Sequence, residues 1–247
     1  MNAHPKTTAL AAGPIAETPT SPPPPDFAKS LMRAAEQLFM HFKAGKPIDA
    51  KMLRAAMEAA FGSSDAQGAW IWKDAYDAAE VAQIMMLSRY GAVMQHHATS
   101  PAAYLSMIER LAALAPSHTR RSEDSVRLQQ FSTPLPLAAI VAQAADIRTT
   151  DLVLEPSAGT GMLAIFAQIS GARLALNELA ETRRNILGHL FPEVQVSDND
   201  AASIDDRLDR AIKPSVIVMN PPFSAAQHVD GKYRQATSQH VLSALAR

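Results

Sequence analysis

The chain has 247 residues, which is room for one large domain or two modest ones. Hydrophobic residues make up 47% of it, enough for a substantial core, and the net charge of -1 argues against a protein that coats nucleic acid through an overall basic field. The absence of cysteine excludes disulfides and thiolate metal sites, and we find neither a signal peptide nor an apolar run long enough for a membrane span, so we expect a cytoplasmic protein.

The first half of the chain predicts a leader followed by helices. Residues 1–25 are rich in Ala, Thr and Pro and are expected to form a disordered or extended leader. Residues 26–118 carry apolar side chains at helical spacing, which predicts a small all-α bundle. Asp49 and Ser100 stand where N-caps are expected, and the longest helix is predicted over about 69–90. The residues expected to face inward on it are Trp70, Ile71, Val81, Ile84, Met85 and Leu87.

The second half changes character after a polar segment. Residues 117–130 are charged and predict a linker or an exposed hinge, in which Arg120 and Arg121 could touch phosphate or simply face solvent. Beyond it, short apolar runs alternate with helical patterns. This alternation predicts repeated βαβ units, a parallel sheet and a Rossmann-like α/β core within residues 119–247. The predicted strands are 152–154, 174–176, 194–196 and 216–219.

A loop of small residues follows the first predicted strand. Glu155-Pro156-Ser157-Ala158-Gly159-Thr160-Gly161 leads directly into a helical pattern that starts at Met162. Such a loop between a strand and a helix lets a ligand approach the backbone closely. Neither Gly-Lys-Ser/Thr nor G-x-G-x-x-G is present, so the loop matches neither the phosphate-cradle motif nor the dinucleotide motif.

Acidic residues follow the second and third predicted strands. Glu178 lies 19 residues after Gly159, where a doubly wound fold places the acid that binds ribose hydroxyls, but it could equally be an ordinary acid at a helix start. Asp200 is our choice over Asp198 for a residue near a bound adenine ring. A polar turn is the alternative role for Asp200.

The fourth predicted strand ends in Asn220-Pro221-Pro222-Phe223. An exocyclic aromatic amine is a poor nucleophile, and two acceptors facing its N–H bonds would aim the nitrogen lone pair at an incoming methyl group. The Asn220 side chain and the Pro221 carbonyl can be those acceptors, and both prolines stiffen the loop. Phe223 offers a face on which a base can stack. Alignment and desolvation could then supply most of the rate without a strong base or a metal. A rigid turn is the structural alternative.

Together these residues resemble the class I S-adenosylmethionine-dependent methyltransferases, and more narrowly the N6-adenine DNA methyltransferases. The resemblance covers about residues 128–247, and it identifies Asn220–Phe223 as the catalytic motif. It implies that Glu178 binds the ribose of the cofactor and that Asp200 lies near its adenine, the latter being the looser match. The matching glycine-bearing motif implies cofactor contacts from Glu155, Ala158, Gly159 and Gly161.

An upstream element of the same family approaches the methionine end of the cofactor. Phe131-Ser132-Thr133-Pro134 matches it, which implies cofactor contacts from Phe131 and Thr133. The same residues also predict a local structural role. Thr133 could be the N-cap, and Pro134 a first-turn residue, of a helix that runs through Ala145. Both roles could hold together.

The segment from Phe131 to Phe223 further resembles the N-terminal methylase module of bacterial strawberry notch-like methylase–helicase proteins. The family core has seven strands, whereas the sequence predicts four before Arg247. We therefore expect the chain to be the front part of a longer protein with a helicase region beyond it. The strand that ends in Asn220 would then lie at a sheet edge, with a helix from about Gln235 after the catalytic loop.

The expected function is S-adenosylmethionine-dependent methylation of adenine N6 in DNA, by direct in-line transfer to a flipped-out base. RNA guanine N2 and a protein glutamine amide are alternative acceptors. A non-catalytic module that docks DNA or a partner is the alternative class. The loop from Ala225 to Gln235 could contact the target strand or be a plain surface loop; its polar residues are His228, Lys232, Tyr233 and Arg234.

Overall fold

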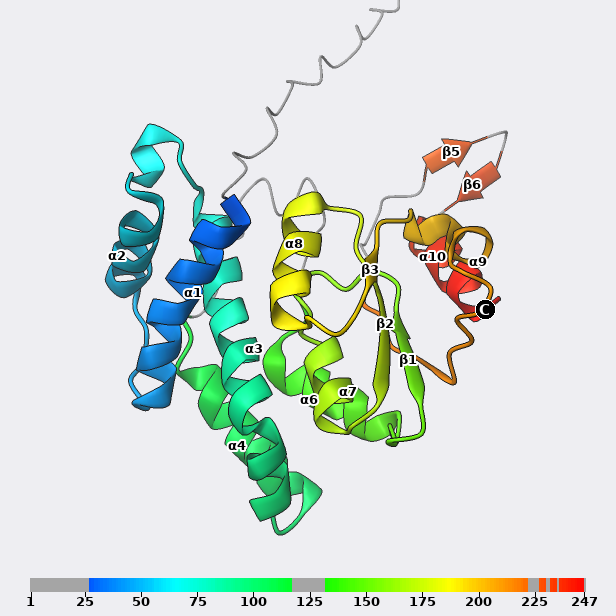
Figure 1. Ribbon diagram of the computed structural model, residues 1–247, viewed down its shortest axis with the longest axis horizontal. Helices are drawn as coiled ribbons and strands as arrows, with labels where there is room; N and C mark the ends of the chain where they lie inside the picture. The colour runs from blue at the N-terminus through cyan, green and yellow to red at the C-terminus, as the bar shows by residue number, and fades with distance from the viewer. Residues whose placement is uncertain (1–26, 117–131, 222–226, 230–231, 235, 247) are drawn as a thin grey trace, which may run out of the picture.

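The computed structural model describes residues 27–116, 132–221, 227–229, 232–234 and 236–246. The predicted leader over residues 1–25 and the predicted linker over residues 117–130 lie outside these ranges, and so do Phe131, Pro222 and Phe223. Within them, the chain forms a helical bundle beside a parallel sheet with helices on both faces (Figure 1). No helix of the described part is both long and apolar enough to cross a membrane.

The predicted bundle is confirmed. Two caps lie where the sequence predicts them: Asp49 accepts a hydrogen bond from the Met52 N–H at 2.8 Å, and the Ser100 hydroxyl accepts one from Ala103 N–H at 3.1 Å. Apolar stripes on these helices pack into one core, in which Leu31, Leu53 and Trp70 are almost fully buried. The helices are α1 (Phe27–Lys43), α2 (Ala50–Phe61), α3 (Trp72–His97) and α4 (Pro101–Ala113), with a short 3-10 turn at Asp65–Gln67.

Helix α3 differs from its prediction at both ends. It begins at Trp72 and continues to His97, beyond the predicted end near residue 90. The predicted inward position of Ile71 is wrong, because Ile71 is the N-cap and its side chain is 45% exposed. The helix runs on through Gly91, where an added Cβ would collide with the Ile169 side chain. Glycine therefore lets α3 pack closely against the core at a position where the sequence alone predicts a weak point in the helix.

The second half forms the predicted α/β core. The sheet has four parallel strands in the order β3-β2-β1-β4, so the strand that leads to Asn220 is an edge strand, as predicted. The third strand begins at Val196, two residues after its predicted start. The strands are β1 (Leu152–Glu155), β2 (Arg173–Asn177), β3 (Val196–Ser197) and β4 (Val216–Ile217). The helices are α6 (Leu135–Ala144), α7 (Ala164–Ile169), α8 (Glu181–Leu190), α9 (Ile204–Arg207) and α10 (Ala236–Leu245), with a 3-10 turn η2 (Ala201–Ser203) before α9.

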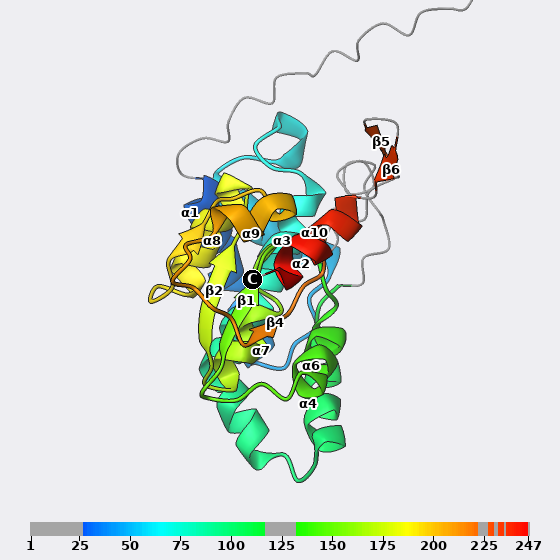
Figure 2. The same cartoon turned by 90° about the vertical axis from the view of Figure 1, so that its right-hand side faces the viewer.

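The two faces of the sheet are covered by different helices. Alternate residues of a strand point to opposite faces, and here Val153 packs into the same core as the bundle, while Leu154 packs against α9 and α10. Figures 1 and 2 show α6, α7 and α8 between the bundle and the sheet, with α9 and α10 on the far side. The bundle and one sheet face thus share a continuous core.

A short antiparallel hairpin occupies part of the segment that the sequence predicts as a loop. It consists of β5 (Gln227–Val229) and β6 (Lys232–Arg234). The sequence between the strands is Asp230-Gly231, a dipeptide typical of two-residue hairpins, and this signal was overlooked. The side chains of His228, Lys232, Tyr233 and Arg234 lie outside the described part, so their predicted contact with a target strand stays a prediction.

Candidate functional site

A pocket of about 210 Å³ lies at the carboxyl ends of the parallel strands. This is the edge where doubly wound folds bind their ligands. Helix α3, the segment before α6 and helix α10 complete the wall. Of the described residues predicted for the site, Gly161 and Pro221 do not line the pocket. Those that do are Thr133, Glu155, Ala158, Gly159, Glu178, Asp200 and Asn220.

The glycine-bearing bend and Glu178 form one hydrogen-bonded unit. Gly159 and Gly161 have φ angles of +59° and +98°, which side chains with a Cβ rarely adopt. The Gly159 N–H donates to Glu178 Oε2 at 2.8 Å, and the Ala180 N–H donates to Oε1 at 2.9 Å. Glu178 therefore stabilises the bend and also binds the backbone N–H of Ala180, the residue before α8. It does not cap the helix, and the ribose role stays a prediction.

Asn177, which the sequence analysis did not single out, connects the loops around the pocket. Its Nδ2 donates to the carbonyls of Pro156 and Asn199 at 2.9 and 2.8 Å. Its Oδ1 accepts from the Ser197 hydroxyl and from the Asn199 N–H, both at 2.8 Å. The side chain is almost fully buried. A polar residue that ends a buried strand just before Glu178 was the signal that could have revealed it.

Asp200 lies on the pocket wall and caps the 3-10 turn η2. Its Oδ1 accepts a hydrogen bond from the Ala202 N–H at 2.9 Å. The polar-turn role weighed for this residue is therefore present in the structure. Its proximity to a bound adenine stays a prediction.

Asn220 and Thr133 come together although they are far apart in the sequence. The Asn220 amide donates from Nδ2 to the Thr133 hydroxyl at 3.1 Å. The predicted N-cap role of Thr133 is wrong, because α6 begins at Leu135 with Pro134 as its N-cap and no side chain caps it. The hydroxyl is turned toward Asn220 instead. Because the nitrogen end of the Asn220 amide donates to Thr133, the contact determines which end of the amide is Nδ2 and which is the acceptor Oδ1.

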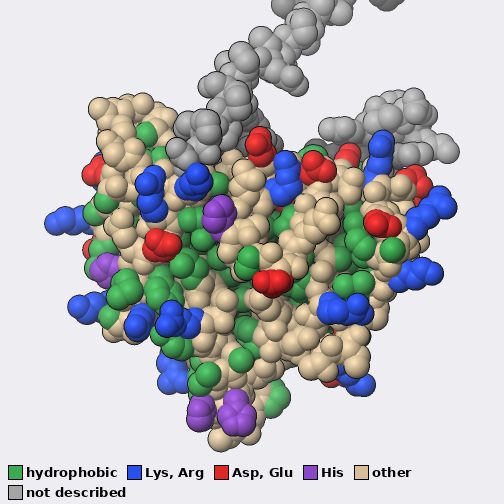
Figure 3. Space-filling model, in the orientation of Figure 1, with side chains coloured by type: hydrophobic (Ala, Val, Ile, Leu, Met, Phe, Trp, Pro, Cys, Tyr) green, Lys and Arg blue, Asp and Glu red, His purple; other side chains and the backbone are tan. Residues whose placement is uncertain are grey.

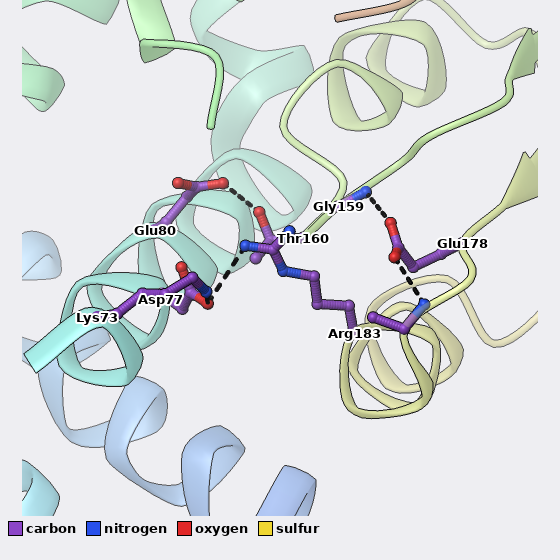
Figure 4. A network of polar contacts seen from close by, with 8 residues as sticks. Lys73, Asp77, Glu80, Gly159, Thr160, Glu178 and Arg183 are labelled. Carbon is purple, nitrogen blue, oxygen red and sulfur yellow. Dashed lines mark hydrogen bonds and ion pairs between the residues drawn. The ribbon is translucent and has the colours of Figure 1, made fainter. Parts of the chain in front are cut away.

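The helical bundle also reaches the pocket, through Glu80 of α3. Figure 4 shows the Thr160 hydroxyl donating to Glu80, and Arg183 of α8 meeting Asp77 of α3. The Arg183–Asp77 distance is 3.6 Å, and Lys73 pairs with the same carboxylate at 2.7 Å. Sequence reasoning missed this contribution. Its signal was the presence of two acids in the stretch from Asp77 to Ile84, whose other residues are apolar except for Gln83.

The pocket wall carries several acidic side chains, of which Glu80 and Glu155 are deeply buried. Burial, with a smaller contribution from nearby Asp77, raises the pKa of Glu80 to about 7, although Thr160, Ser132 and Arg183 oppose the shift. Burial also raises the pKa of Glu155 well above its ordinary value, with Glu178 and Glu80 adding to the effect. Among the described residues, Oε2 of Glu155 and Nδ1 of His240 are buried without a hydrogen-bond partner. Both residues line the pocket, so its wall holds polar atoms suited to a ligand with N–H or O–H groups.

The visible face of the molecule has no single basic patch. Figure 3 shows Lys and Arg side chains scattered over it, with acidic side chains among them. This distribution accords with the net charge of -1. Any nucleic acid that meets this face would do so through local contacts rather than through a broad field.

Comparison with known proteins gives matches of limited extent. No protein-family model matches the chain, and no curated protein matches its sequence. Among solved structures, one similar chain is described as a "putative RNA methyltransferase" from Pyrococcus horikoshii. The two chains are 21% identical, the match covers 57% of this chain and 68% of that one, and the TM-score is 0.42. The residues of the pocket are therefore the observations from which a function can be inferred.

Proposed function

We propose that this chain is an S-adenosylmethionine-dependent methyltransferase that acts on the exocyclic amine of adenine in DNA. The observation that carries the proposal is that Asn220 opens onto the same pocket as Gly159 and Glu178. If the asparagine turn lay far from the glycine bend, no methyl group held at the bend could reach an amine held by Asn220. Their convergence on one pocket supports a transfer site.

The residues present fit such a cofactor. Its ribose offers a vicinal diol, for which a carboxylate such as Glu178 is a suitable acceptor. Its methionine end carries an ammonium group, and the buried Glu155 Oε2 that lacks a partner is an acceptor for such a group. When bound, the cofactor would supply an electrophilic methyl group on a positively charged sulfur. The acidic wall suits that positive charge.

On the acceptor side, the chain orients and polarises the target amine. The Asn220 Oδ1 and the Pro221 carbonyl would accept its two N–H bonds, which draws the lone pair out of the ring and toward the methyl group. The hydrogen bond to Thr133 restricts the orientation of the Asn220 amide group, and in this proposal Oδ1 is the end that accepts from the substrate amine. As the new N–C bond forms and the S–C bond breaks, one amine proton must leave to solvent.

The test is methyl transfer from tritium-labelled cofactor to DNA, RNA and protein acceptors, with the chain itself and with Asn220→Ala. We expect label in DNA, a loss of about 100-fold or more in Asn220→Ala, and unchanged cofactor binding, because only the acceptor that acts in the transition state is removed. Asn185→Ala, on the exposed side of α8, is the matched control and should retain full activity.

The other outcomes each refute a stated part of the proposal. Label in RNA or protein and none in DNA would refute the DNA assignment. A chain that binds the cofactor and labels none of the acceptors would refute the catalytic assignment. Full activity in Asn220→Ala would refute the role given to Asn220.

A further inference from the structure

Glu80 occupies an unusual position for a residue of the helical bundle. It lies in the first half of α3, is 8% exposed, and lines the same pocket as Thr133 and Asn220. Its carboxylate accepts a hydrogen bond from Thr160 in the glycine bend, and Ser132 also hydrogen-bonds to it. Burying an acid costs free energy unless it is paired, so the position of Glu80 against two pocket segments points to a role for it there.

The described part of the pocket wall around Glu80 has more acidic than basic side chains. The pocket wall carries the carboxyl groups of Glu80, Glu155, Glu178 and Asp200, while Arg183 is its cationic side chain among the described residues. Arg183 is already paired with Asp77 behind the wall. The Oε2 atom of Glu155 is buried at 2% residue exposure without a hydrogen-bond partner. This part of the pocket therefore suits a cation that brings several N–H donors.

Glu80 and Glu178 meet the glycine bend from opposite sides (Figure 4). Glu178 directly follows β2 and contacts Gly159, whereas Glu80 comes from α3 and contacts Thr160. A cofactor whose ribose is held by Glu178 would extend its other end across the bend toward Glu80. That end of S-adenosylmethionine is an amino acid with an ammonium group.

We propose that Glu80 binds the ammonium group at the amino-acid end of the cofactor, which makes the helical bundle a part of the cofactor site. This inference rests on the proposed function and deepens it. Thr160 and Ser132 hydrogen-bond to the carboxylate, and Glu155, which lines the same pocket, would share the ammonium group with it. The pocket would then recognise one ligand from both of its ends.

The test compares two ligands by titration calorimetry on the whole chain. S-adenosylhomocysteine carries the ammonium group, and 5′-deoxy-5′-methylthioadenosine has the same adenosine and thioether but lacks the amino-acid end. In Glu80→Gln we expect the first ligand to bind about tenfold more weakly and the second to bind within about twofold of the wild type. Glu36→Gln removes the same charge from an exposed position of α1 and should alter neither affinity.

The results separate this inference from the proposal beneath it. If the unmodified chain binds no S-adenosylhomocysteine, the proposed function itself fails, and this inference fails with it. If the unmodified chain binds it and Glu80→Gln binds it equally well, only the role of Glu80 is refuted. Equal weakening of both ligands also refutes it, because Glu80 would then act by shaping the bend.

A second variant guards against loss of folding. Glu80→Asp keeps the charge and withdraws it by one methylene. It should also weaken S-adenosylhomocysteine selectively while sparing methylthioadenosine, and unchanged affinity for both ligands would refute the contact. Circular dichroism and the urea midpoint show whether each variant is folded.

Discussion

Replacing Gly161 by alanine should destabilise the protein strongly, although the residue does not line the pocket. Gly161 has φ of +98°, and a Cβ placed there would lie 2.6 Å from Cε2 of Phe191 and 3.0 Å from Cδ2 of Leu187. Both partners are fully buried, at 1% and 0% exposure, so neither can swing aside into solvent. The Phe191 N–H is also bonded to the Leu187 carbonyl at 2.8 Å, which fixes the backbone that carries the ring.

Two costs add at this position. The left-handed backbone costs an L-residue about 1–2 kcal/mol, and overpacking against a fixed ring costs about 1–3 kcal/mol. We therefore expect Gly161→Ala to lower the free energy of unfolding by about 2–5 kcal/mol, a large share of the roughly 5–15 kcal/mol of a typical domain. Gly159→Ala is the matched control. It has φ of +59° but nothing within 4 Å of its added Cβ, so only the backbone cost of about 1–2 kcal/mol applies.

Urea unfolding followed by circular dichroism measures both free energies. A double-mutant cycle of Gly161→Ala with Phe191→Leu isolates the steric part, because the smaller side chain relieves the collision. The coupling should be about 1–3 kcal/mol in the direction of rescue. If Gly161→Ala and Gly159→Ala have the same free energy of unfolding, or if the double-mutant cycle shows no coupling, the steric reasoning is wrong.

Three further perturbations follow from the same contacts. Asn177→Ala removes the hydrogen bonds that join the pocket loops and leaves their buried partners unsatisfied, so the unfolding free energy should fall by about 3 kcal/mol or more; a loss below about 1 kcal/mol in urea would contradict this. Asp77→Ala removes the carboxylate that lies between two largely buried cations of α3 and α8, so the free energy of unfolding should fall by about 3 kcal/mol. Asp65→Ala, which breaks an exposed pair with Arg54, should lower it by less than about 1 kcal/mol. Equal losses in the two variants would argue against a stabilising buried network. Burial raises the pKa of Glu80 from 4.5 to about 7, so the folded state holds this proton more tightly than the unfolded state. Its contribution to the free energy of unfolding is fully present below about pH 4.5 and is lost as pH rises through about 7. Between pH 4.5 and 8, the free energy of unfolding of the wild type should fall by about 3 kcal/mol relative to that of Glu80→Gln. Parallel plots of unfolding free energy against pH for the two proteins would refute this.

The sequence predicts the sheet and its functional edge well because those signals are local. Short apolar runs followed by glycine, acidic or proline turns mark the strand ends, and parallel strands bring such ends to one edge. Glu178 and Asn220 could therefore be assigned to a common site before their positions were known. The hydrogen bond between Asn220 and Thr133 spans 87 residues, and no local pattern predicts it.

Buried polar contacts between distant segments account for most of what sequence reasoning missed. Thr133 has the sequence setting of an N-cap, and only the return of the chain at β4 turns its hydroxyl elsewhere. Glu80 reaches Thr160 across 80 residues, so its role depends on how the bundle packs on the core. Asp77 and Glu80 could have been noticed as acids in a stretch of mostly apolar residues, but not assigned to a partner.

The position of the bundle connects stability to function. A parallel sheet needs cover on both faces, and here the bundle core runs on without a break into the face that contains Val153. Gly91 lets α3 approach α7 closely. The same helix, α3, carries Glu80 to the glycine bend. The burial that anchors the bundle is thus the burial that raises the pKa of Glu80 and brings its carboxyl group to the pocket. An acid kept in such a place at a cost in stability is typical of a binding site, because solvent-exposed helix faces provide acidic positions without that cost.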